Sequence, residues 1–220
     1  KMTAIGTTKF GEAVGKATSH PFGIGNARFH YSDKTEEVDS VYLGAWSMRV
    51  FEKIGLFDEE LVRNQDDEFN YRIREVGGKV LLHPGIKSKY TVRSTPSGLW
   101  QQYFQYGYWK VRVMQKHPRQ MSLRQFIPPT FVLSLIVSLI LAFTISWGWI
   151  PLVAILGSYL AANFACSLSI AQKEGWQILR LLPIAFAIIH ISYGLGFLVG
   201  LVKFANRWND KSGKVPEWHH

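Results

Sequence analysis

The sequence predicts a mixed α/β region followed by an interfacial helix and an all-α transmembrane region. Three observations carry this prediction. Residues 1–127 hold 19 Lys and Arg side chains against 13 Asp and Glu, which is a net charge of +6. Residues 125–172 then contain no charged side chain, and residues 181–202 again contain none. Because a water-soluble globule rarely leaves 48 consecutive residues uncharged, a purely soluble protein is excluded.

The composition excludes other classes as well. Abundant aromatic and β-branched residues exclude a disordered chain. The single cysteine, Cys166, lies inside an apolar run, so neither a disulfide framework nor a cysteine-based metal site is expected. The Lys and Arg residues follow no recognisable nucleic-acid-binding motif and are densest next to an apolar run. This distribution favours membrane lipid as a partner and excludes nucleic acid.

The polar part alternates short helical and strand-forming segments. A Gly-rich loop separates the first helix from an alternating, β-prone strand, and Gly77-Gly78 ends a helix that Asn64 can cap and whose first turn is acidic. The expected elements are helix 10–19, loop 20–26, strand 38–43, helix 47–54, helix 64–76, strands 79–82 and 88–93, and helix 97–116. Two or three strands are too few for a complete nucleotide-binding sheet, and no Gly-rich phosphate loop follows a strand. The polar part is therefore expected to be the second part of a domain whose beginning lies upstream of Lys1.

Three apolar runs predict three transmembrane helices, at residues 130–145, 152–170 and 181–202. A bilayer core about 30 Å thick needs about 20 helical residues, and each run is near that length. The junction at 146–151 supplies a turn with tryptophans suited to the headgroup level. The alternative interpretation is that these are buried helices of a large soluble core.

The distribution of basic residues predicts the topology, with one conflict. Five of them closely precede the first run and favour a cytoplasmic polar part: Lys110, Arg112, Lys116, Arg119 and Arg124. Three spans would place the tail on the opposite side, yet the tail carries Lys203, Arg207, Lys211 and Lys214. Either residues 181–202 form a re-entrant or in-plane element, or the tail is an exception to the rule.

An acidic run, Asp66-Asp67-Glu68, opens the helix predicted at 64–76. The structural interpretation is that the two aspartates complement the helix N-terminus and that Glu68 pairs with Arg72 at i,i+4. The functional interpretation is that one aspartate, held at the helix start beside a cleft, acts as a general base.

The order of several motifs resembles the acceptor half of family 2 glycosyltransferases. The matching residues are Gly44-Ala45-Trp46, Arg49, Phe51-Glu52-Lys53-Ile54-Gly55-Leu56-Phe57-Asp58-Glu59, Gln65-Asp66, Phe69, Arg72 and Gly77-Gly78. Tyr103-Phe104-Gln105-Tyr106-Gly107 and Lys116-His117-Pro118 add a resemblance to the succinoglycan-biosynthesis type. The resemblance covers residues 21–126 and, more loosely, the apolar runs that follow.

This resemblance implies a membrane-bound inverting enzyme of polysaccharide or exopolysaccharide synthesis. Such an enzyme moves a sugar from a nucleotide-sugar donor to a lipid-linked or glycan acceptor at the cell's inner (cytoplasmic) membrane. It also implies an organisation: the acceptor-side part of a GT-A-type catalytic domain at 1–96, an amphipathic interfacial helix and linker at 97–127, transmembrane helices at 128–204 and a tail at 205–220. The alternative from another class is a non-catalytic, membrane-anchored protein that binds a partner or serves as a scaffold.

Carried over by residue, the resemblance makes Asp66 the general base. Gln65 stands where the family has Glu, which leaves Asp67 as the register alternative. The substrate-binding positions implied are Gly44, Ala45, Arg93 and Gln102. From the residues alone, Arg93 could equally form a surface salt bridge.

The family also implies Mg²⁺ or Mn²⁺, held by an Asp-x-Asp motif that stabilises the leaving group. This chain contains no such triplet, and its acid runs, 58–60 and 66–68, do not follow a strand in the required way. No metal ligand is therefore assigned in this chain, and the chain is expected to be inactive alone.

The helix at 97–116 carries many aromatic residues together with Lys110, Arg112 and Lys116. This composition predicts a helix in the membrane interface, with the basic side chains near lipid phosphates. His190 in the third run should face a partner or a cavity, and the glycines near it predict close helix packing. His83 is expected to be structural, and residues 20–23 with Asn26 belong to the acceptor loop by resemblance.

Overall fold

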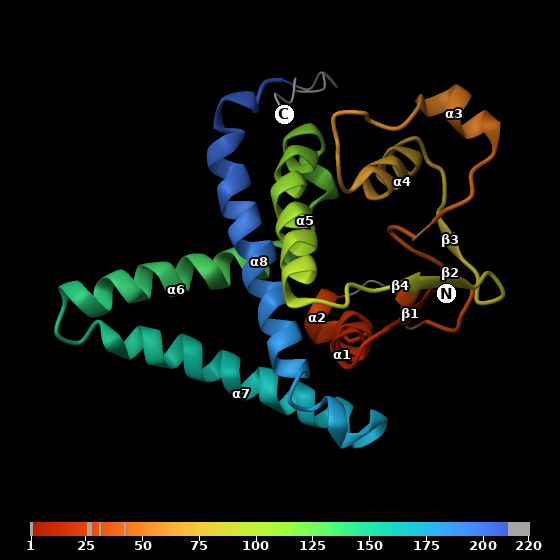
Figure 1. The fold of residues 1–220 in the computed structure, drawn as a ribbon. Helices are drawn as coiled ribbons and strands as arrows, with labels where there is room; N and C mark the ends of the chain where they lie inside the picture. The colour runs from red at the N-terminus through yellow and green to blue at the C-terminus, as the bar shows by residue number, and fades with distance from the viewer. Residues whose placement is uncertain (1, 26–27, 31, 42, 211–220) are drawn as a thin grey trace.

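The computed structural model describes residues 2–25, 28–30, 32–41 and 43–210, and helices dominate it (Figure 1). Two long helices run side by side through the molecule, α5 (Pro96–Lys116) and α8 (Leu182–Lys203). The polar region, residues 1–96, lies on one side of this pair, and a hairpin of two apolar helices projects from the other side. The predicted order of a mixed region before an all-α region is confirmed.

Two small sheets hold the polar region together. The strands β1 (Met2–Ile5) and β4 (Ser88–Thr91) pair in parallel, with Met2 opposite Ser88. The strands β2 (Glu36–Glu37) and β3 (Leu81–Leu82) pair antiparallel. Of these, β1 was not predicted, because its partner lies more than 80 residues further along the chain.

The strand predicted at 38–43 is wrong. The pairing ends at β2, after which the backbone N–H of Val38 donates one more hydrogen bond to the carbonyl oxygen of Val80 at 2.9 Å. Leu43 has a φ of +51°, in the left-handed region that an extended strand cannot contain. The β-prone alternation is real, but β3 offers only two residues to pair with.

The predicted helices of the polar region are present within a residue or two. The structure has α1 (Lys9–Thr18), α2 (Pro21–Ile24), a 3₁₀ turn at Arg28–His30, α3 (Met48–Ile54) and α4 (Gln65–Glu75). The hydroxyl of Thr8 accepts a hydrogen bond from the Gly11 N–H at 3.0 Å and caps α1. The segment α2 lies where only a loop was expected.

Asn64 does not cap α4 with its side chain, which corrects that prediction. Its φ is +66°, and its side-chain amide donates to the carbonyl oxygen of Tyr106 at 3.2 Å instead. Asn64 therefore ties the start of α4 to α5. The acidic first turn of α4 is as predicted.

An aromatic cluster positions α4 within the polar region. Trp46, Phe51, Phe57 and Phe69 pack with ring centroids 4.6–6.4 Å apart, and Phe69 is fully buried. A Cβ at Gly44 would lie 2.5 Å from the Trp46 ring, so Gly44 is needed for that ring to pack. The cluster gives the start of α4 a rigid support.

The prediction that the basic side chains of α5 lie near lipid phosphates is wrong, whereas the placement of this helix in the membrane interface stays a prediction. Lys110, Arg112 and Lys116 are all buried, and each forms an ion pair with an acidic side chain of the polar region. Those carboxylates lie 43 to 58 residues earlier in the chain, beyond the reach of a local pattern. Two short turns, Pro118–Gln120 and Leu123–Phe126, then lead from α5 into the apolar helices.

Among the described residues, three helices are long and apolar enough to cross a membrane: α6 (Ile127–Thr144), α7 (Trp149–Glu174) and α8. The helices α6 and α7 form the hairpin in Figure 1, joined by a turn at residues 145–148, whereas residues 149–151 of the predicted turn belong to α7. Within their most apolar stretches, 17% of the residues of α6 and of α7 are buried, against 50% in α8. The first two therefore present most of their surface outward, whereas α8 is half enclosed. Turns at Trp176–Ile178 and Ala205–Arg207 flank α8.

Candidate active site

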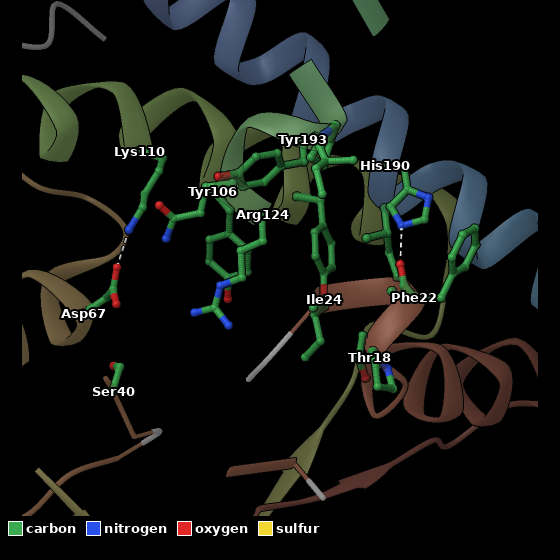
Figure 2. Close-up of a pocket in the computed structure, with 18 of the residues that line it drawn as sticks. Thr18, Phe22, Ile24, Ser40, Asp67, Tyr106, Lys110, Arg124, His190 and Tyr193 are labelled. Carbon is green, nitrogen blue, oxygen red and sulfur yellow. Dashed lines mark hydrogen bonds and ion pairs between the residues drawn. The ribbon is translucent and has the colours of Figure 1, made fainter. Parts of the chain in front are cut away.

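A cavity of about 910 Å³ lies between the polar region and the apolar helices. One part of its wall comes from the start of α4 and from α5, and another part comes from α6, α7 and α8. Figure 2 shows Asp67 and Lys110 on one side of it, Phe22 and His190 on the other, and Arg124 between them. The cavity thus connects ionisable groups with apolar side chains such as Phe131 and Ile155.

Asp66 and Asp67 both line this cavity, but their surroundings differ. The Asp67 carboxylate forms an ion pair with Lys110 and accepts a hydrogen bond from the Gln120 amide at 3.0 Å. Asp66 has no ion pair among the residues that the structure describes, and its Oδ1 accepts only the backbone N–H of Asp67, at 2.9 Å. Of the two aspartates, Asp66 is the one whose carboxylate is available to another group.

The pKa of the Asp66 carboxyl lies above its ordinary value. Burial is the main cause, because it disfavours the charged form, and the negative charge of Asp67 acts in the same direction. The hydrogen bond from the Asp67 N–H and the charge of Lys110 offset part of this increase. A carboxylate with a raised pKa binds a proton more readily, as a general base must.

A buried network holds α4 in place beneath the two aspartates. Glu68 is 2% exposed and forms the predicted pair with Arg72, at 2.8 Å. His117 Nε2 lies 2.8 Å from the same carboxylate, and Arg72 also donates to the carbonyl oxygens of Ile54 and Leu56. Burial alone would raise the pKa of Glu68, but the hydrogen bonds from His117 and Arg72 lower it below its ordinary value.

Gln102 forms part of the cavity wall on α5. Its side-chain amide donates to the hydroxyls of Tyr90 and Tyr106, at 2.7 and 2.9 Å. Burial raises the pKa of Tyr106, so this hydroxyl remains protonated. The part of the wall formed by Gln102, Tyr90 and Tyr106 is therefore polar but uncharged.

Arg124 reaches the cavity from the turn before α6. Figure 2 shows its guanidinium in the open middle of the cavity. No ion pair to Arg124 occurs within the described parts of the chain, whereas Lys110 pairs with Asp67 and Arg28 pairs with Glu36 at 2.5 Å. The Arg124 side chain passes over Gly25, where a Cβ would approach its Cδ to 3.2 Å. The Arg124 guanidinium therefore presents its positive charge to a ligand in the cavity.

His190 faces the cavity, as predicted for a polar residue in the third apolar run. Its Nε2 lies 2.8 Å from the carbonyl oxygen of Phe22, so Nε2 donates, and Nδ1 then accepts from the Tyr159 hydroxyl at 3.0 Å. Phe22 packs edge-on against the imidazole with centroids 5.0 Å apart. His190 thereby joins α8, α7 and α2.

The structure does not bring all of the predicted residues to the cavity. Gly44 and Ala45 lie beside the aromatic cluster, and Arg93 is exposed before α5, so none of the three lines the wall. Of the segment 20–23, all but His20 line it, and Asn26 is outside the described residues. His83 accepts the Gly85 N–H at 3.1 Å within an exposed turn.

The described residues do not fit a divalent cation at this cavity. Across those residues, no group of three or more His, Cys, Asp or Glu side chains could hold a metal ion. Of the four carboxylates that line the cavity, three already form ion pairs: Asp67 with Lys110, Asp39 with Arg74 and Glu37 with Lys79. The described part of the chain therefore offers Asp66 as a lone carboxylate, which is too few ligands for a metal site.

The contributions of three residues to the site, Lys110, Gln120 and Arg124, were not predicted from the sequence. Lys110 and Gln120 distinguish Asp67 from Asp66, but nothing local in the sequence signals contacts that span 43 and 53 residues. Arg124 was noted only as one of the basic residues before the first apolar run. The signal that could have identified Arg124 as a residue of the site is its position between the polar region and the first apolar helix.

Comparison with known proteins finds two relatives at low identity. The chain is 23% identical over 208 residues to the succinoglycan biosynthesis protein ExoA of Rhizobium meliloti (strain 1021), covering 94% of this chain and 61% of that protein. It is 27% identical over 183 residues to the dolichyl N-acetyl-alpha-D-glucosaminyl phosphate 3-beta-D-2,3-diacetamido-2,3-dideoxy-beta-D-glucuronosyltransferase of Methanococcus voltae, covering 81% of this chain and 52% of that protein. No family model and no solved structure matches.

These similarities support the predicted resemblance to glycosyltransferases of glycan synthesis. The chain spans little more than half of the length of the curated relatives it matches. The activity of the whole protein is therefore a matter for proposal.

Proposed function

We propose that the protein is a membrane-bound inverting glycosyltransferase. It would move a sugar from a nucleotide-sugar donor to a hydroxyl of a lipid-linked or polysaccharide acceptor, at the cytoplasmic face of the inner membrane. The observation that carries this proposal is Asp66, a carboxylate with a raised pKa and no ion pair among the described residues, at a cavity that continues between apolar helices. The similarity to two proteins of glycan synthesis supports the reaction class.

In the proposed reaction Asp66 accepts the proton of the acceptor hydroxyl. The acceptor oxygen forms a bond to the anomeric carbon while the bond from that carbon to the donor's diphosphate breaks, and the electron pair leaves with the diphosphate. Attack from the face opposite the leaving group inverts the configuration. One positioned carboxylate contributes about 10²–10⁴-fold to such a step. Mg²⁺ or Mn²⁺ is implied by the family resemblance alone.

Lys110 and Gln120 have a supporting role in this proposal. They hold the Asp67 carboxylate at the cavity wall, and Asp67 in turn donates its backbone N–H to Asp66. Arg124 would bind a phosphate of the substrate, because a guanidinium pairs with phosphate oxygens through two parallel hydrogen bonds. The acceptor's apolar part would then lie toward Phe131 and Ile155.

The experiment compares Asp66→Asn with Asp67→Asn in the full-length protein, with sugar transfer from a labelled nucleotide sugar as the readout. We expect Asp66→Asn to lose at least about 100-fold in turnover while donor binding and unfolding temperature stay near those of the parent. We expect Asp67→Asn to lose stability together with activity, because Lys110 would be left buried without its carboxylate.

Near-normal turnover of Asp66→Asn would reject Asp66 as the base. If Asp67→Asn alone abolished turnover while remaining stably folded, the base would be Asp67. A full-length parent that transfers no sugar from any of the common nucleotide-sugar donors would favour the non-catalytic, membrane-anchored alternative.

A further inference from the structure

The first half of α8 is attached to the polar region. Leu182, Phe186 and Ile189 are buried in the same apolar cluster as Val14 and Ala17 of α1. Phe186 also packs edge-on against Phe22, with ring centroids 5.0 Å apart. Together with the hydrogen bond from His190 to the Phe22 carbonyl oxygen, these contacts anchor the beginning of α8 beside α1 and α2.

The far end of α8 is attached to the polar region as well. Arg207, just after the helix, forms an ion pair at 2.7 Å with the fully buried carboxylate of Glu60. Arg112 of α5 donates to the same carboxylate at 2.8 Å and to the carbonyl oxygens of Arg207 and Asp210. The Gln115 amide donates to the Phe204 carbonyl oxygen at 2.8 Å. The segment that follows α8 is therefore part of a buried polar network.

Between its two ends, α8 lies in close contact with α5. A Cβ at Gly196 would lie 2.1 Å from the carbonyl oxygen of Phe104, and a Cβ at Gly200 would lie 2.7 Å from that of Tyr108. Gly107 of α5 approaches the Tyr193 carbonyl oxygen just as closely. The two helices run side by side along this stretch (Figure 1).

Because of these contacts, α8 and the polar region must lie at the same depth relative to a membrane. A helix of 22 residues is about 33 Å long, close to the thickness of the hydrocarbon core. If α8 crossed the membrane, the polar region that flanks it from end to end would also lie at hydrocarbon depth. That region exposes charged side chains such as Glu52, Lys53 and Glu59, and isolated charges in hydrocarbon are strongly disfavoured.

The hairpin of α6 and α7, unlike α8, exposes apolar side chains over most of its length. Both of its ends lie at the polar region: Arg124 enters the cavity just before α6, and Glu174 at the end of α7 pairs with Lys16 of α1 at 2.6 Å. Its outward faces carry large exposed apolar side chains over most of both helices: Leu133, Ile136, Val137, Leu139, Ile140 and Phe143 on α6, and Trp149, Ile150, Val153, Leu156, Leu160 and Phe164 on α7. Figure 1 shows the hairpin projecting away from α5 and α8.

We propose that, within the described chain, the α6–α7 hairpin alone crosses the bilayer, and that α8 lies along the membrane surface beside α5. The partner of the exposed apolar side chains of α8, Ile184, Val199 and Val202, is then the boundary between headgroups and acyl chains. Residues 204–210 lie on the same side of the membrane as the polar region. This arrangement removes the conflict with the distribution of basic residues, because Lys203 and Arg207 join Arg124 on one side.

The test compares three single-cysteine variants in a full-length background without other cysteines, which in this chain requires Cys166→Ser. Glu52→Cys reports the polar region, Ser146→Cys the hairpin turn and Asn209→Cys the segment after α8, and all three positions are exposed. A membrane-impermeant maleimide is applied to intact cells and to permeabilised cells. We expect Asn209→Cys to follow Glu52→Cys, and Ser146→Cys to label from the opposite side.

Labelling of Asn209→Cys from the same side as Ser146→Cys would overturn the proposal, since α8 would then cross. Labelling of all three positions from one side would also overturn it, since the hairpin would not cross. Lys53→Cys and Asn206→Cys, which are likewise exposed, repeat the comparison if a first variant fails to accumulate. The readout requires no enzymatic activity, so its result is independent of the proposed transferase function.

Discussion

The close contact between α5 and α8 can be tested with one methyl group. Gly196 approaches the backbone of Phe104, and a Cβ at this position would lie 2.1 Å from its carbonyl oxygen and 2.8 Å from its carbonyl carbon. A Cβ at Gly157, in the outward-facing helix α7, would have no atom within 4 Å. Gly196→Ala and Gly157→Ala therefore add the same group to two apolar helices, one in contact and one in open space.

The expected difference follows from the distances. Non-bonded heavy atoms rest about 3.5–4.0 Å apart, so Gly196→Ala requires α5 and α8 to separate by more than about 1 Å. The obstructing atoms belong to the backbone and cannot rotate away, which places the cost near the upper end of about 1–3 kcal/mol for overpacking. Alanine recovers about 0.5–1 kcal/mol of helix propensity at either position. We expect a net loss of about 2 kcal/mol for Gly196→Ala and a small gain for Gly157→Ala.

Thermal unfolding in detergent micelles measures both variants. For a chain of this size, 1 kcal/mol corresponds to about 2–4 °C in Tm, so Gly196→Ala should unfold roughly 4–8 °C below its parent. Gly157→Ala should unfold at or slightly above the temperature of the parent. Equal unfolding temperatures for the two variants would show that α5 and α8 are not packed as described.

Three further predictions concern charged groups. Arg124→Gln should raise KM for a phosphate-bearing substrate about 10-fold or more with a smaller change in kcat, because a charge-assisted hydrogen bond contributes about 1.5–3 kcal/mol; an unchanged KM in steady-state kinetics contradicts the phosphate role. Since Asp66 acts as a base only when ionised, kcat/KM should rise with pH through a pKa above the ordinary aspartate value, and an acid limb at or below that value contradicts the assignment. Glu60→Gln leaves the fully buried Arg112 without its carboxylate and should cost about 3–5 kcal/mol in denaturant unfolding, whereas the exposed Glu59→Gln should be nearly neutral. Burial alone would raise the pKa of Glu60, but Arg112 and Lys116 lower it below its ordinary value, so this stabilisation is present above the unfolded pKa and is lost as pH falls through the folded pKa.

Local signals predicted most of the helices correctly. Helix α1 lies within one residue of its predicted bounds, α4 carries acids in its first turn, and three apolar runs correspond to α6, α7 and α8. Each of these signals acts within a few residues of the element that it specifies. The sequence of one chain is therefore sufficient to predict these helices.

The strands and the orientation of α5 depend on partners far away in the chain. Strand β1 is four residues long and is a strand because it pairs with β4, whereas the described residues of 38–43 have no partner strand beyond the single hydrogen bond from Val38 to Val80. A basic helix rich in aromatics has the same sequence pattern whether its cations meet lipid phosphates or buried carboxylates. The basic side chains of α5 face protein because they pair with the carboxylates of Asp58, Glu60 and Asp67. These contacts exist only in the folded chain.

The sequence predicted three of the residues that line the cavity, Asp66, Asp67 and Gln102, while their roles stay predictions. The acidic helix start pointed to Asp66 and Asp67, and the choice between them required knowing which of the two pairs with Lys110. The predicted Gln102 lines the same cavity, whereas Gly44, Ala45 and Arg93 lie elsewhere. Sequence patterns thus located the acids, and three-dimensional contacts show that Asp67 is ion-paired and Asp66 is not among the described residues.

Hydropathy cannot distinguish a helix that crosses a bilayer from one that is half enclosed by its own protein. The mean hydropathy of α8 is 2.0, between the values of 2.3 and 1.6 for the segments of α6 and α7. What differs is how much of each helix faces protein: half of the apolar stretch of α8 is buried, including Gly196, Ser192 and His190, against 17% of that of α7, which leaves Gly157 in open space. A run of glycines on one face of an apolar helix indicates a backbone in close contact, and a polar side chain between them indicates that the contact is with protein instead of lipid. In this chain that pattern favours the interpretation of α8 as a helix bound along the polar region, and the distribution of basic residues around α8 points in the same direction.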